Sequence, residues 1–121
     1  MILVDTSIWV AHLRRGNSDL SALLSDGEAA CHPFIIGELA CGNLKNRKEI
    51  LSLLTALPSL PTIDQEEFLA FVEHDHLAGL GLGFVDIHLL ASARLSGTPL
   101  WTSDRALKQV AAQLGVVHPD Y

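Results

Sequence analysis

The chain contains few cysteines, few basic residues and no long hydrophobic segment. Its two cysteines, Cys31 and Cys41, have no further Cys or His at zinc-like spacing, so we interpret both as buried small apolar residues. The longest apolar segments, such as residues 34–40, are too short to cross a bilayer. The apolar start at residues 1–4 ends at Asp5, which argues against a signal or transit peptide. We therefore expect a cytoplasmic protein with no membrane segment.

Lysine and arginine are scarce, with 8 such residues against 14 acidic ones and a formal net charge of −6. A negative charge argues at first against a nucleic-acid partner, because phosphates usually meet a basic surface. The charges are segregated, however, since five of the bases precede residue 49 and the segment 64–75 contains acids but no base. A basic face therefore stays compatible with this sequence.

The 121 residues fit one compact domain, 1–121, without repeats or linkers. Strand patterns alternate with helical patterns along the chain, which predicts a mainly parallel sheet with helices on both sides. We expect a three-layer α/β/α sandwich with four to five strands. The expected strands are 1–4, 28–31, 61–63, 99–102 and 116–118, and the expected helices are 8–15, 18–25, 33–39, 47–57, 64–77, 84–95 and 104–114.

Four acidic residues stand out by their position. Asp5 follows the first strand, Asp104 follows the strand 99–102, and Asp86 begins the helix after a glycine-rich loop. In open α/β sheets such places, at the carboxyl ends of strands, collect ligands. Glu38 is the only charged residue between Cys31 and Leu44, and an acid in such apolar surroundings needs a compensating cation or donor.

Four carboxylates that converge would repel one another unless a divalent cation lay among them. Oxygen ligands of this kind suit Mg²⁺, with Mn²⁺ as a substitute, and not zinc or copper. Such an ion lowers the pKa of a bound water and polarises a phosphodiester, which is the chemistry of a phosphodiester hydrolase. The sequence has no Gly-rich nucleotide loop and no convincing serine or cysteine triad.

The segments that carry these acids resemble the PIN domain, and in particular the VapC-type toxins of bacterial toxin–antitoxin pairs. The matching segments are VDTS at 4–7, GEL at 37–39 with Gly42, VDIHLLASA at 85–93 and LWTSD at 100–104. Each is weak alone, but four in one short chain, in the right order and spacing, are specific. The resemblance covers the whole chain and implies a PIN-like fold.

The resemblance also implies a function. Asp5, Glu38, Asp86 and Asp104 would form the acidic quartet that holds Mg²⁺, and Thr6 or Ser7 together with Thr102 would be the hydroxyls that orient it. The implied activity is endoribonuclease cleavage of RNA. The implied partners are a small cognate antitoxin, whose C-terminal segment covers the site, and a second copy of the chain in a homodimer. We expect 5′-phosphate products, because no histidine is placed for a 2′-hydroxyl mechanism.

Other interpretations of the same residues exist. Asp5 and Asp104 could serve only as helix N-caps, and Asp86 could merely complement a helix dipole. A haloacid-dehalogenase phosphatase would need a second Asp where Ser7 stands, and a phospho-receiver domain would need an acidic pair. A catalytically inactive PIN-like interaction module is the alternative from another class, although the presence of all four acids argues against it.

Several further features have two interpretations. Trp9 and Trp101 are interpreted as core residues before base-stacking ones, and His74, Asp75 and His76 as a solvated helix surface. Arg14 and Arg15 could meet phosphates or simply end a helix in solvent, whereas the stretch 45–48 favours a surface helix start. The helices 47–57 and 64–77 carry enough apolar residues to suggest an exposed groove for an inhibitor or a second subunit.

Overall fold

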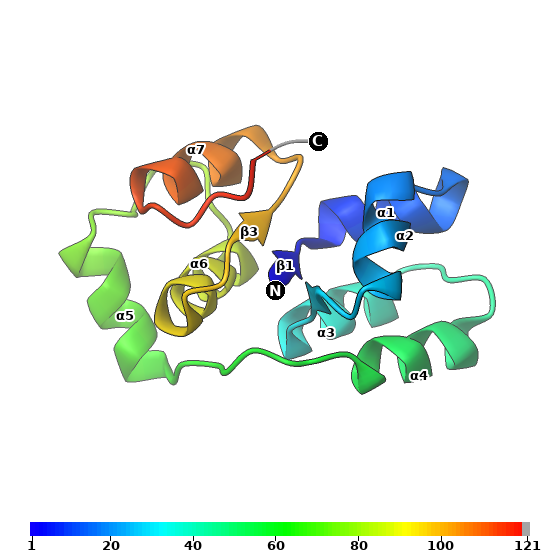
Figure 1. Ribbon diagram of the computed structural model, residues 1–121. Coiled ribbons are helices and arrows are strands. Elements are labelled where there is room, and N and C mark those ends of the chain that lie inside the picture. Colours follow the sequence, from blue (N-terminus) through cyan, green and yellow to red (C-terminus); the bar gives the residue numbers. More distant parts are fainter. Residues whose placement is uncertain (120–121) are drawn as a thin grey trace.

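The computed structural model describes residues 1–119. Short strands are separated by one or more longer helices, two after the first strand and four after the second (Figure 1). The strands are β1 (Ile2–Val4), β2 (Ala29–Ala30) and β3 (Leu100–Trp101). The helices are α1 (Thr6–Arg15), α2 (Ser18–Ser25), α3 (Pro33–Cys41), α4 (Arg47–Ala56), α5 (Gln65–His74), α6 (Phe84–Ser96) and α7 (Arg105–Gln113).

The strands form one parallel sheet in the order β2-β1-β3, so the first strand of the chain lies in the middle. Leu3 pairs with Ala30 on one side and with Leu100 on the other. Leu3 and Val4 have no exposed surface, as expected for a strand covered on both faces. The parallel α/β fold expected from the sequence is therefore confirmed.

The expected number of strands, four to five, is wrong. In the part of the chain that the structure describes, the sheet has three strands, and each edge is extended only by an isolated bridge, Cys31 to Ser59 and Leu100 to Val117. The segment 61–63 forms no strand, because Pro61 has no N–H to give to a ladder and its carbonyl accepts a hydrogen bond from Ser92 instead.

Helices cover both sides of the sheet. In the view of Figure 1, α1, α2 and α7 lie above the strands and α3 and α6 lie below them, while α4 and α5 flank this lower layer. Helix α6 is buried almost all round from Ile87 to Ala93, whereas α7 buries the stripe of Leu107, Val110 and Ala111. No helix within residues 1–119 is long and apolar enough to cross a membrane.

Helix α5 ends earlier than the expected boundary at residue 77. The helix stops at His74, Asp75 is its C-cap, and His76 adopts a left-handed backbone with φ of 55°. Its start is as expected, because Asp64 and Glu67 form a reciprocal capping box, with hydrogen bonds of 2.8 and 3.0 Å. The shorter helix leaves residues 75–83 as the connection that leads into α6 and Asp86.

Candidate active site

Asp5 lies at the carboxyl end of the central strand and is the N-cap of α1. Its side chain is only 5% exposed. The Oδ2 atom accepts hydrogen bonds from Ser7 Oγ at 2.8 Å and from Thr102 Oγ1 at 2.7 Å. Two hydroxyls thus satisfy one oxygen of a nearly buried carboxylate and fix its orientation.

Thr102 connects this carboxylate to the neighbouring strand. It follows β3 directly, is 2% exposed, and accepts a hydrogen bond from the Asp104 backbone N–H at 3.0 Å while it donates to Asp5. The Ser103 N–H donates to Ser7 Oγ at 3.1 Å, which adds a second link. Asp104 itself is exposed and caps α7, with Oδ2 accepting from the Leu107 N–H at 2.9 Å.

Glu38 projects from α3, the helix that His32 caps and Pro33 begins. The residue is exposed, and its Oε1 atom accepts a hydrogen bond from Thr6 Oγ1 at 2.6 Å. Thr6 belongs to the first turn of α1, next to Asp5. Of the hydroxyls expected from the sequence, Thr6 therefore contacts Glu38, whereas Ser7 and Thr102 both contact Asp5.

Asp86 lies in the first turn of α6, where its Oδ2 accepts a hydrogen bond from the Gly83 N–H at 2.9 Å. Burial raises the pKa of this carboxyl group above its ordinary value, and the hydrogen bond from Gly83 partly opposes that rise. The negative charges of Asp5, Asp104 and Glu38 raise the pKa further. The fold thus brings all four acids close enough for Asp86 to interact with the other three.

Each of the four carboxylates uses one oxygen in the hydrogen bonds just described. Within residues 1–119 the other oxygen of each group, Oδ1 of the three aspartates and Oε2 of Glu38, makes no hydrogen bond. This donor set fits a hard divalent cation, because it offers only oxygen atoms and because the crowded negative charge needs compensation.

Among the described residues, no three His, Cys, Asp or Glu side chains form a group that could hold a metal ion. Each of the four carboxylates contacts a nearby hydrogen-bond donor. Whether the four acids ligate a metal ion therefore stays a prediction.

Only some of the residues that the sequence assigned to structural roles lie where expected. Cys31 is buried, but Cys41 is exposed, so the interpretation of both cysteines as buried is wrong for Cys41. Trp9 and Trp101 are 3% and 5% exposed and belong to the core. The side chain of Asp75 is only 10% exposed, so the expected solvated helix surface is wrong for this residue. Asp75 forms an ion pair with Arg94 and accepts a hydrogen bond from His74, the larger cause of its lowered pKa. Its carboxylate oxygens are therefore engaged by side chains rather than left for a metal.

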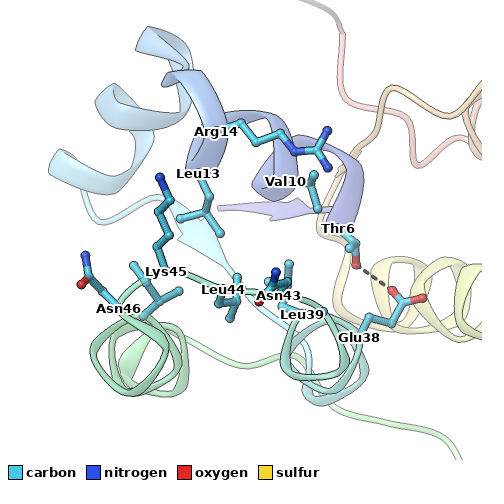
Figure 2. Close-up of a pocket in the computed structure, with 12 residues that line it drawn as sticks. Thr6, Val10, Leu13, Arg14, Glu38, Leu39, Asn43, Leu44, Lys45 and Asn46 are labelled. Atoms are coloured by element: carbon cyan, nitrogen blue, oxygen red, sulfur yellow. Dashed lines mark hydrogen bonds between the residues drawn. The ribbon is translucent and has the colours of Figure 1, made fainter.

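Sequence reasoning missed a cleft beside Glu38. It has a volume of about 550 Å³ and lies between α1 and the end of α3 with the segment that follows (Figure 2). Arg14 and Lys45 line it, although the sequence left Arg14 open and favoured a surface role for the stretch 45–48. Only their spatial relation to Glu38, which lies 24 and 7 positions away, could have revealed this.

Comparison with known proteins agrees with this geometry. Residues 2–113 match the family model described as PIN domain, and the chain belongs to the PIN-domain family. The protein Ribonuclease VapC32 of Mycobacterium tuberculosis strain CDC 1551 / Oshkosh is 48% identical over 117 residues, which cover 96% of this chain and 94% of the relative. Ribonuclease VapC32 of strain ATCC 25618 / H37Rv matches with the same figures.

The fold has a counterpart among solved structures. The crystal structure of PAE2754 from Pyrobaculum aerophilum matches with a TM-score of 0.59 over 94% of this chain and 88% of the other chain. The two sequences are only 20% identical, so this likeness concerns the fold alone.

Proposed function

We propose that this chain is a metal-dependent endoribonuclease and the toxin of a toxin–antitoxin pair. The observation that carries the proposal is that the charges of Asp5, Glu38 and Asp104 all act on the carboxyl group of Asp86, while one oxygen of each carboxylate makes no hydrogen bond within residues 1–119. Four separate segments supply these acids, and a relative with 48% identity over nearly the whole chain bears the name of a ribonuclease.

Asp5, Glu38, Asp86 and Asp104 would hold Mg²⁺ or Mn²⁺. When bound, such an ion supplies a more acidic water and compensates the charge that develops on a phosphodiester. The chain itself supplies orientation, because Thr102 and Ser7 hold Asp5 and Thr6 holds Glu38. By orienting Asp5 and Glu38, these hydroxyls would contribute to affinity for the metal.

The proposed partners are RNA, a cognate antitoxin protein and a second copy of the chain. Exposed apolar side chains on the outer helices support a protein partner, since large apolar residues at a surface favour association when they gather. Leu53 on α4 and Leu69 on α5 are 59% and 54% exposed, and Leu95 on α6 is 65% exposed. A groove of about 390 Å³ between α5 and α6 includes Phe71 and Leu95.

The test combines cleavage of single-stranded RNA with thermal melting. We expect cleavage to stop in EDTA, to return with Mg²⁺ or Mn²⁺ but not Ca²⁺, and to leave 5′-phosphate ends that ligate directly. Asp86→Asn and Glu38→Gln should abolish cleavage, whereas the control substitutions Asp64→Asn and Glu73→Gln, in α5 and its cap, should keep it.

Thermal melting tests the alternative that the chain is a catalytically inactive interaction module. Mn²⁺ should raise the melting temperature of the parent chain and of the two controls but not that of Asp86→Asn, because only an intact site binds the ion. Cleavage that persists in EDTA, or products with 2′,3′-cyclic phosphates, would contradict a metal mechanism. Absence of both cleavage and a Mn²⁺ shift in the parent chain would instead indicate an interaction module.

A further inference from the structure

The cleft of about 550 Å³ is continuous with the candidate active site formed by the four acidic side chains. Thr6 and Glu38, which share a hydrogen bond of 2.6 Å, belong both to the site and to the cleft wall. In Figure 2 the labelled side chains of α1 face those of α3 and of the α3–α4 connection across the cleft. A polymer bound at the carboxylates can therefore continue into this cleft without leaving the surface.

Two cations line the cleft and are not used elsewhere. Arg14 and Lys45 are exposed, and neither makes an ion pair or a hydrogen bond within residues 1–119. Arg47 donates to the carbonyls of Ala40 and Gly42, and Arg94 pairs with Asp75. Arg15, Lys48 and Arg105 also lack an ion pair within residues 1–119, but they do not line the cleft. In a chain of net charge −6, two available cations next to a group of acids favour an anionic ligand at this place.

The rest of the cleft suits the base of a nucleotide. Its apolar side chains include Val10, Leu39 and Leu44, which are buried or partly buried and offer contact surface to a flat ring. Asn43 is exposed at the same cleft and carries both a donor and an acceptor, the groups that read the edge of an unpaired base. An apolar wall with a few polar groups and cations matches a nucleotide better than a free phosphate.

We propose that this cleft seats one nucleotide of single-stranded RNA beside the bond that is cut. Arg14 and Lys45 contact its phosphates, the apolar wall packs against its base, and Asn43 reads the base edge. The inference rests on the proposed ribonuclease function and adds to it the place where sequence preference arises. A peptide segment of a protein partner is the competing occupant, and the experiment below distinguishes the two.

The chain provides matched controls for both cations. Arg15 and Lys48 are exposed, lie one and three positions away, and do not line the cleft. The probe is a short, dye-labelled single-stranded RNA of mixed sequence, bound in Ca²⁺ and followed by anisotropy, with cleavage measured separately in Mn²⁺. We expect Arg14→Gln and Lys45→Gln each to weaken binding about fivefold to tenfold and raise KM with little change in kcat. Arg15→Gln and Lys48→Gln should change either quantity less than about twofold.

Salt dependence adds a readout that a structural defect would not produce. For single-stranded RNA, losing one phosphate contact should reduce the slope of log affinity against log salt concentration by about 0.7. Cleft variants that match their controls in affinity and slope would overturn the proposal. So would cleft variants that bind RNA normally but no longer bind the protein encoded beside the chain, because the cleft would then be a protein-docking surface.

Two further outcomes test base recognition by Asn43 and the proposed ribonuclease function separately. Mapping of cleavage ends should show that Asn43→Ala loses preference at the nucleotide beside the cut, while Asn17→Ala, which affects the cap of α2, keeps it. An unchanged preference in Asn43→Ala would refute base reading by this residue. A parent chain that binds RNA through Arg14 and Lys45 without cutting it would refute the ribonuclease function but keep the nucleotide site.

Discussion

Protonation of the buried His32 should destabilise the fold at low pH. His32 has no exposed surface, and its Nδ1 atom accepts a hydrogen bond from the Phe34 N–H at 3.0 Å, which caps α3. Its Nε2 atom lies 3.1 Å from Ser92 Oγ, and that hydroxyl donates to the Pro61 carbonyl at 2.6 Å. The neutral ring with its proton on Nε2 satisfies every partner, whereas a protonated Nδ1 could no longer accept the capping bond.

The size of this loss in the free energy of unfolding follows from the pKa of His32. Burial, with a smaller contribution from the charge of His88, lowers the pKa of His32 from 6.5 to about 4. Between these values the unfolded chain binds a proton that the folded chain does not, so the free energy of unfolding falls as the pH falls. Each pKa unit corresponds to about 1.4 kcal/mol, which gives a loss of about 3 kcal/mol by pH 4. Above pH 6.5 the contribution is fully present.

Urea unfolding of His32→Asn against the parent chain tests this reasoning. Asparagine retains an acceptor for the α3 cap but does not titrate, so the stability difference between parent and variant should narrow by about 3 kcal/mol from pH 7.5 to pH 4. The control is His76→Asn, at an exposed residue whose positive φ suits asparagine. Parallel stability curves for the parent and His32→Asn over this range would refute the assignment.

Two further substitutions address the site and the core beside it. Thr102→Val keeps the shape of a buried side chain but removes the hydroxyl that contacts Asp5 and Asp104, so the free energy of unfolding in urea should fall by about 1 to 3 kcal/mol and RNA cleavage should weaken. The control Thr102→Ser should retain the stability and the cleavage activity. An equal loss of stability in the two variants would contradict a role of the hydroxyl. His88→Leu should raise the free energy of unfolding by about 1 kcal/mol, because both ring nitrogens are buried and lack a hydrogen-bond partner within residues 1–119. A destabilised His88→Leu would show that the ring contacts with Phe34 stabilise the fold by more than the buried nitrogens destabilise it.

The sequence predicted the positions of the acids better than their contacts. Asp5 and Asp104 follow buried strands, and both strands and the helices after them could be recognised from apolar patterns and glycine stops. The hydrogen bond between Thr102 and Asp5 joins residues 97 positions apart, and no local pattern reports such a pairing. Because side-chain orientation depends on this tertiary contact, the sequence alone could name the acids but not arrange them.

The edges of the sheet were the least predictable part of the fold. The β-branched and apolar character of segments 61–63 and 116–118 favours strands. The bridge on one side lies at Ser59, outside segment 61–63, and segment 116–118 contributes only a single bridge, at Val117. Edge pairing depends on which backbone N–H groups are available, and two prolines, Pro58 and Pro61, limit them on one side. The prediction that α5 ends at residue 77 was wrong for a related reason, because the left-handed backbone conformation of His76 has no strong sequence signal.

The central place of β1 has a consequence for the order in which the protein is made. Among the strands of residues 1–119, β1 is made before the other two and pairs with both, and its partner β3 is made only after α1 to α6. Until residues 100–102 have emerged, Asp5 has no Thr102 to hold it, and Asp104 has not yet been added to the nascent chain. For the proposed ribonuclease, this order means that the nascent chain has no complete site until Thr102 and Asp104 have emerged.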